Sequence, residues 1–200
     1  MNPCALGSSR ARGQIDVFAP ARLSGKLETV VCYPDKMSIA IESGPTKLRQ
    51  VLVGEEGWVV QNGKTFGAPP QALQSLKVGL FHNINNLWRF LANPANLPYI
   101  SVQPHNGTST IVIIRPGNAD RISKIDCDDE LTMRSVSYCS CDSSGQLIQN
   151  RIEYDGFHER NSIRYPAKVR SYQNDQLISE VRHDDYETDI ELGPSLFQKV

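Results

Sequence analysis

The sequence contains no apolar run long enough to cross a membrane as a helix. A spanning helix needs about 20 predominantly apolar residues. The most apolar stretch of this 200-residue chain, residues 80–91, is interrupted by one histidine, three asparagines and one arginine. The first ten residues also lack the basic, apolar and small-residue segments of a secretory signal. We therefore expect no transmembrane segment, and either a cytoplasmic protein or a periplasmic or cell-envelope protein whose export signal lies upstream of Met1.

An excess of charge of either sign is also missing. The chain has 21 basic and 22 acidic residues, a formal net charge of -1, so nucleic acid and anionic lipid surfaces are not expected partners. Its 40% apolar and 22% charged residues are typical of a globular protein. A chain of this length can bury roughly 70% of its unfolded surface in one core. We expect a single domain over residues 1–200, disordered over 1–9, and a monomer.

Cysteine spacing provides no metal-binding or redox motif. The five cysteines are an odd number without a CxxC pair, which disfavours a zinc ribbon or a thioredoxin-type site. Cys139 and Cys141 would share one face of a strand, where one of them could pair with Cys127 on a neighbouring strand. Small buried thiols are the favoured interpretation, because free cysteine is among the most buried residue types. The residues before Cys4 are not those of a lipid-anchor cleavage site.

Catalytic motifs are missing as well. The chain has no G-x-S-x-G elbow, no H-E-x-x-H helix and no phosphate-binding glycine loop. Asp126 and Asp128 could present oxygens to a hard cation, but without the glycine and terminal glutamate of an EF-hand loop they are better interpreted as part of a solvated turn. We therefore predict no catalytic residue, no metal site and no cofactor, and we expect that the protein is not an enzyme.

What the sequence does contain is a series of short strands separated by turn residues. Apolar residues alternate with small or polar ones, as at Met37, Ile39 and Ile41, and turn signals such as Asn62-Gly63 follow at short intervals. About a dozen strands are expected, over residues 13–18, 26–33, 37–41, 47–53, 58–61, 99–103, 110–115, 122–126, 132–141, 147–154, 163–172 and 176–186. The alternation predicts an antiparallel sheet with one buried face.

One segment changes period and predicts a helix. After Pro69-Pro70, leucine and isoleucine recur at three- and four-residue steps from Leu73 to Leu91. The pattern predicts helical structure over 69–92, either as one helix or as two helices joined near Gly79 or His82. The proline-containing segment 93–98 then ends it.

The order of several short motifs resembles the LolA/LolB superfamily of bacterial lipoprotein carriers. The motifs are Pro34-Asp35-Lys36, Gly54-Glu55-Glu56-Gly57-Trp58, Tyr154-Asp155-Gly156-Phe157, Ile163 to Val169 and Ser195-Leu196-Phe197. The resemblance implies a mostly β fold: a strongly curved antiparallel sheet, an unclosed barrel of about 11 strands, with a helical plug over its concave face. It makes 69–92 the plug and gives five candidate cavity residues, Phe81, Ile84, Leu87, Trp88 and Leu91. For any one of these side chains, completion of a dry core is the favoured interpretation.

The same resemblance implies a function without a covalent step. The half-barrel would bind or transfer a lipid, a lipoprotein acyl chain or another apolar ligand in the bacterial cell envelope. A lipid or an acylated protein would be the partner, with envelope proteins as further candidates. The alternative is a sensor or interaction module that binds a protein partner on the same scaffold, by adding a strand to the open edge of the sheet.

Overall fold

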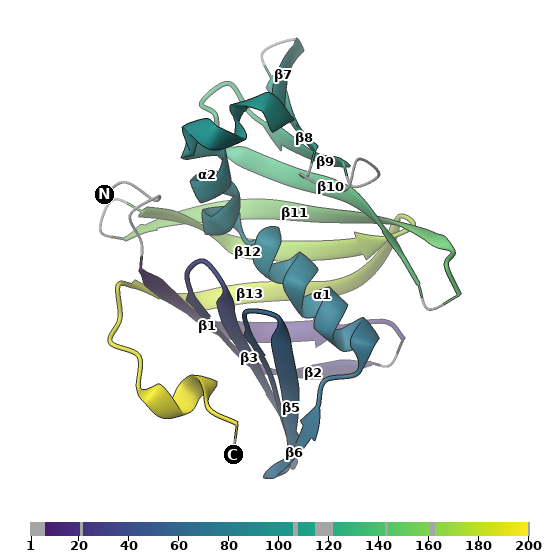
Figure 1. Cartoon of the computed structure of the whole chain (residues 1–200), viewed down its shortest axis with the longest axis vertical. Helices are drawn as coiled ribbons and strands as arrows, with labels where there is room; N and C mark the ends of the chain where they lie inside the picture. Colours follow the sequence, from purple (N-terminus) through teal and green to yellow (C-terminus); the bar gives the residue numbers. More distant parts are fainter. Residues whose placement is uncertain are drawn as a thin grey trace.

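A single antiparallel sheet of thirteen strands dominates the computed structural model, which describes residues 7–20, 22–105, 108–114, 122–142, 144–160 and 163–199 (Figure 1). The strands lie in the order β6-β5-β4-β3-β2-β1-β13-β12-β11-β10-β9-β8-β7. Their bounds are β1 (Ser8–Val17), β2 (Leu23–Cys32), β3 (Lys36–Ser43), β4 (Thr46–Val53), β5 (Glu56–Gln61), β6 (Lys64–Gly67), β7 (Ile100–His105), β8 (Thr108–Ile114), β9 (Ile122–Cys127), β10 (Met133–Cys141), β11 (Leu147–Arg160), β12 (Ile163–Gln173) and β13 (Gln176–Thr188).

The helices lie on the concave side of this sheet, in the segment of chain that runs from one edge strand to the other. β1 and β13 pair at the middle of the sheet, and each half then builds outward to an edge, at β6 on one side and β7 on the other. The segment that joins β6 to β7 contains α1 (Pro70–Phe81), α2 (Ile84–Ala92) and the 3-10 helix η2 (Pro94–Tyr99). It therefore spans the open mouth of the half-barrel, as Figure 1 shows. None of the described helices has the length and apolar character needed to cross a membrane.

A bulge at the centre of the sheet requires glycine. The register between β1 and β13 shifts between Arg12 and Gly13, and a bulge of this kind bends a strand and increases its twist. A Cβ atom added to Gly13 would lie 1.9 Å from the backbone oxygen of Arg182. No other residue fits this close approach without moving the backbone.

The predicted fold class is confirmed, but the sheet has thirteen strands rather than about 11, and two stretches of strand were not expected from the sequence. β6 was missed because Lys64–Gly67 is only four residues long and contains a single large apolar side chain, Phe66. The sheet also starts earlier than expected: Ser8 and Ser9, which belong to the segment predicted to be disordered, are buried strand residues. Ser9 pairs with β13 on one side and β2 on the other. Its backbone is therefore fixed in the sheet, although Ser8 and Ser9 have small, polar side chains that give no strand signal. Residues 1–6 lie outside the described residues.

The helical segment breaks at His82 and Asn83, as in the two-helix alternative. The side chain of Asn83 accepts a hydrogen bond from the backbone N–H of Asn85, at 3.1 Å, and so caps the first turn of α2. Asparagine favours such caps over helix interiors because its side chain competes for backbone hydrogen bonds. The cap turns the chain, and the two helices pack against different parts of the sheet.

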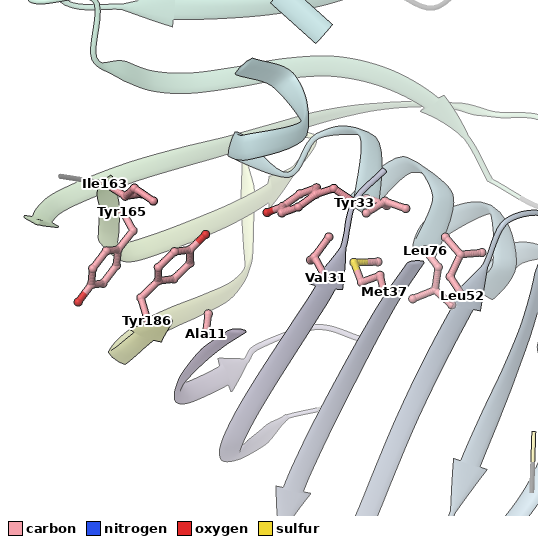
Figure 2. Close-up of a cluster of buried hydrophobic side chains, with 10 residues drawn as sticks. Ala11, Val31, Tyr33, Met37, Leu52, Leu76, Ile163, Tyr165 and Tyr186 are labelled. Carbon is pink, nitrogen blue, oxygen red and sulfur yellow. The ribbon is translucent and has the colours of Figure 1, made fainter. Parts of the chain in front are cut away.

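α1 packs on the N-terminal half of the sheet. Its Leu76 and Leu80 are buried against Met37 on β3 and Leu52 on β4, in a cluster that continues across the centre of the sheet to Tyr186 (Figure 2). This cluster accounts for half of the predicted leucine stripe. The leucines of α1 determine its orientation: they face β3, β4 and β5, and the opposite side of the helix faces away from these strands.

α2 packs on the C-terminal half. Leu87 has no exposed surface and lies in a second buried cluster with Ile113, Ile125 and Val136, from β8, β9 and β10. One apolar stripe in the sequence therefore serves two cores, because the chain turns at Asn83.

The C-terminal 3-10 helix η3 (Pro194–Phe197) covers part of the outer face of the sheet. It contacts β3 and β4. Val30 and Val51 alternate with Val31 and Leu52 of the inner cluster and so lie on the outer face, as does Trp58, which pairs with Val51. Each of the three is at most 5% exposed. In Figure 1 the C-terminal segment lies on the side of these strands away from α1. In this half of the sheet α1 therefore packs on the inner face of β3, β4 and β5, and η3 lies against the outer face of β3 and β4.

Candidate functional site

A cavity of about 690 Å³ lies between α1 and the C-terminal half of the sheet, and we call it the inner cavity. On the helix it is lined by the side of α1 that faces away from the leucines, including Gln71, Gln74, Ser75 and Val78. On the sheet it is lined by residues of β10, β11 and β12 and the turn after β10, namely Tyr138, Ser140, Cys141, Asp142, Ile148, Asn150 and Gln173. Helix α1 thus stands between two walls of the half-barrel and fills only the space beside one of them.

The sheet wall of the inner cavity carries a row of polar side chains across three strands. Asn150 on β11 is 8% exposed, and its Nδ2 donates to Ser140 Oγ on β10 at 2.8 Å. Gln173 Nε2 on β12 donates to Asn150 Oδ1 at 3.4 Å. The apolar contributions come from Tyr138 and Ile148. The cavity therefore combines neutral hydrogen-bonding groups with apolar surface.

A second space of about 690 Å³, the outer groove, lies beside α2. Its apolar part includes Phe81 and Phe90, whose rings meet edge to face with centroids 5.7 Å apart. Its rim contains Lys77, which forms an ion pair with the exposed Glu55, and Arg89, whose guanidinium lies 5.5 Å from the centroid of a tyrosine ring. The outer groove is thus a partly apolar trough with charged groups at its edge.

The five candidate cavity residues from the sequence do not lie together in either space. Leu87 is fully buried, and Ile84, Trp88 and Leu91 pack against the cluster around it. Phe81 packs there too and also lines the outer groove. Four of the five therefore pack in or against the core between α2 and the sheet, Phe81 also lines the outer groove, and a ligand contact stays a prediction for all five.

Sequence reasoning missed the polar lining of the inner cavity. Gln71, Gln74, Ser75 and Val78 recur at helical spacing on the side opposite the leucines. That pattern was readable, but a polar helix face normally indicates solvent, so nothing distinguished it from an ordinary exposed surface. The burial of Asn150 could not be predicted from the sequence, because it depends on β10 and β12 lying on either side of β11.

A buried polar network fixes the break between the helices to the sheet. Asn85 is 3% exposed, and its Nδ2 donates to the hydroxyls of Tyr33, at 2.8 Å, and Tyr186. Tyr33 Oη also lies 2.9 Å from Ser9 Oγ. Figure 2 shows the two tyrosine hydroxyls directed toward each other. Burial raises the pKa of both tyrosines, so both hydroxyls stay protonated and can donate.

A histidine and a serine at the same break have the geometry of a base and a nucleophile but are closed to substrate. His82 Nε2 lies 2.9 Å from Ser123 Oγ, and His82 Nδ1 lies 2.9 Å from the backbone oxygen of Val78. The imidazole is stacked on the Tyr138 ring at 3.8 Å. Because His82 is 3% and Ser123 1% exposed, a substrate cannot reach the hydroxyl. The pair attaches the helix break to β9 and has no access for catalysis.

The acidic residues Asp126 and Asp128 form hydrogen bonds and an ion pair with other side chains and backbone groups of the protein. Asp126 accepts hydrogen bonds from Thr110 Oγ1 and Ser135 Oγ, both at 2.8 Å. Asp128 accepts from the backbone N–H of Thr132 at 2.7 Å and pairs with Arg134. Throughout the described ranges no group of three or more histidine, cysteine or acidic side chains is arranged to hold a metal ion.

The cysteines divide into buried and exposed thiols. Cys32, Cys127, Cys139 and Cys141 are all free, so the considered pairing with Cys127 does not occur. Cys127 is buried as expected, and burial raises the pKa of its thiol to about 11. The expectation of burial is wrong for Cys139 and Cys141, which are exposed. Cys139 alternates along β10 with the partly buried inner-face residue Tyr138, whereas Cys141 is the last residue of the strand and lines the inner cavity. Cys4 lies outside the described residues.

Comparisons with known structures define the fold. The chain is similar to a LolA superfamily protein from Nitrosomonas europaea, with 11% identity over 98% of this chain and 91% of that chain and a TM-score of 0.63. It is similar to a DUF1329 family protein from Desulfovibrio piger, with 10% identity over 97% and 90% of the two chains and a TM-score of 0.62. It is also similar to a protein domain from Vibrio parahaemolyticus described as outer membrane lipoprotein-sorting, with 9% identity over 96% and 89% and a TM-score of 0.56.

The protein has a LolA-like fold, as the sequence motifs indicated. No protein-family model and no curated protein matches the sequence. The similarity therefore rests on the arrangement of the sheet and helices in space.

Proposed function

We propose that this protein is a non-enzymatic carrier that binds an apolar chain, from a lipid or an acylated protein, beside helix α1. The observation that carries the proposal is the presence of two spaces of about 690 Å³ each, the inner cavity and the outer groove, where α1 and α2 cross the mouth of the half-barrel. Small-molecule sites typically enclose roughly 300–1,000 Å³. Either space is large enough to hold an acyl chain.

The energetics allow useful affinity from burial alone. An acyl chain of about 14 methylenes gains about 11 kcal/mol at about 0.8 kcal/mol per methylene, before the cost of ordering the chain is subtracted. Loss of translational freedom and of chain flexibility removes a large part of that gain. The remainder corresponds to reversible binding, which a carrier needs in order to release its ligand.

The similar structures support a carrier rather than an enzyme. Two of the three are described as LolA superfamily and outer membrane lipoprotein-sorting proteins. By analogy we place this protein in the bacterial cell envelope, with lipid or acylated protein as its partner. The inaccessibility of the His82 and Ser123 pair is consistent with a function that has no covalent step.

Native mass spectrometry of the purified protein, followed by organic extraction, tests whether an apolar molecule co-purifies. Titration with a fluorescent fatty acid measures the affinity. Val78→Trp fills the inner cavity, and we expect it to weaken binding at least about tenfold, which corresponds to about 1.4 kcal/mol. Val102→Trp is the control, because Val102 is 60% exposed on β7 and lines neither space. An empty wild-type protein that also fails to bind the fluorescent acid would refute the proposal.

A second candidate function is recognition of an extended protein segment at the β7 edge. β7 is an edge strand, and its sequence, ISVQPH, contains no lysine, arginine or acidic residue. Edge strands normally carry such charges or a proline to prevent pairing with other chains, and Pro104, near the end of β7, leaves residues 100–103 of the strand without either. A partner that adds a strand there would be blocked by Val102→Lys, whereas fatty-acid binding would be unchanged. Loss of both activities together would count against a separate edge site.

A further inference from the structure

The inner cavity is more polar than an alkyl chain requires. Gln71 and Gln74 on α1 lie on one wall, and Asn150 and Gln173 on the sheet lie on the other. An alkyl chain between these walls would remove water from the amides and return no hydrogen bond, which costs affinity. A ligand group that donates and accepts hydrogen bonds would replace the lost water.

The same cavity offers almost no charge. Among the described residues that line it Asp142 is the only acid, and none of them is a lysine, arginine or histidine. The Asp142 carboxylate accepts from the backbone N–H groups of Ser144 and Gln146, at 2.8 and 2.9 Å, and is thereby committed to the turn after β10. A charged head group would find no opposite charge, so the lining favours a neutral hydrogen-bonding group.

We propose that the inner cavity is a subsite for a secondary amide on the ligand, with Gln74 and Gln173 as specificity-determining residues. Each glutamine side chain has one carbonyl acceptor and two N–H donors, which complement the N–H and C=O of an amide. Both glutamines are exposed to the cavity from opposite walls, and the Asn150 side chain orients Gln173. The apolar part of the ligand lies against Val78, Tyr138 and Ile148. This inference rests on the proposed function, because it assumes that the protein binds an acylated ligand and assigns the amide group of that ligand to the inner cavity.

The test compares two neutral ligands that differ in a single group. N-hexadecanoylglycinamide has an amide N–H where the hexadecanoyl ester of glycolamide has an ester oxygen. Their affinities are measured by displacement of a fluorescent fatty acid from the purified full-length protein. Because a bound ligand displaces water from the two glutamine side chains, a ligand that leaves them unpaired loses affinity, and we expect the amide to bind about tenfold more tightly than the ester.

The variant Gln74→Leu/Gln173→Leu should abolish this preference by weakening amide binding, while ester binding is unchanged or tighter. Gln14→Leu, at an exposed position of β1 outside the cavity, is the matched control and should retain the preference. Equal binding of both ligands to the wild type, or an unchanged preference in the double variant, would overturn the amide subsite and leave the carrier proposal standing. Binding of neither ligand would refute both. The urea midpoint of each variant confirms that the protein remains folded.

Discussion

Substitution of Asn85 tests whether the helix break is fixed by its buried polar network. Asn85→Ala removes two hydrogen bonds, to the hydroxyls of Tyr33 and Tyr186, from a site that is 3% exposed. At about 1 kcal/mol for each lost bond, plus the cost of a small void, we expect a loss of about 2–3 kcal/mol in the free energy of unfolding. Alanine has a higher helix propensity than asparagine, so a purely local effect would have the opposite sign.

Urea denaturation followed by tryptophan fluorescence measures this loss, since Trp58 and Trp88 lie in the two halves of the molecule. A double-mutant cycle with Tyr186→Phe then isolates the contact. Each single variant breaks the same hydrogen bond, so the double variant should be more stable than the sum of the two predicts, by about 1 kcal/mol. Gln74→Ala at an exposed position of α1 should change stability by less than about 0.5 kcal/mol.

The reasoning would be refuted by either of two results. An Asn85→Ala variant as stable as the wild type would mean that the tyrosine hydroxyls find other partners at no cost. Additivity of Asn85→Ala and Tyr186→Phe within about 0.5 kcal/mol would mean that the two side chains are not coupled.

Three further predictions follow from other parts of the structure. Cys139 should be alkylated rapidly at neutral pH and Cys127 only on unfolding, as measured by mass spectrometry of the modified peptides; modification of Cys127 in the native protein would contradict its burial. Burial lowers the pKa of His183, so the unfolded state binds more protons and stability falls as the pH drops below about 6.5. His183→Gln should reduce that fall in urea titrations between pH 7 and 5, and parallel curves would exclude the effect. Gly13→Ala should lower the free energy of unfolding, measured by urea denaturation, by about 1–3 kcal/mol, because its Cβ would meet the backbone oxygen of Arg182. Gly67→Ala, with open space around the new Cβ, should leave the free energy of unfolding unchanged.

Most of the fold could be predicted from the sequence because its signals are local. Alternation along each strand, as at Met37 to Ile41, and turn residues such as Asn62-Gly63 specify hairpins that pair in chain order. The pairing of β1 with β13 depends on residues more than 160 positions apart, as in Ile15 with Val181, and no local pattern encodes it. Weak local signals also explain why β6 and the start of β1 at Ser8 were missed.

The candidate site was less predictable because cavities form where side chains fail to meet. The apolar stripe of the helical segment identified residues that pack, such as Leu87 and Trp88, and packing is what an apolar stripe encodes. The space itself lies beside the polar side of α1, at Gln74, and its far wall comes from strands that adjoin only in the folded sheet. A sequence pattern therefore locates the core more directly than the cavity next to it.

The location of a bound acyl chain tests the central claim most directly. A fatty acid that carries a photoreactive diazirine near its methyl end is bound, irradiated and mapped by mass spectrometry of the digested protein. We predict cross-links to residues that line the inner cavity or the outer groove, such as Val78, Ile148 or Phe90. Cross-links confined to the outer face of the sheet, or labelling that an excess of unlabelled fatty acid does not prevent, would contradict a carrier site beside α1.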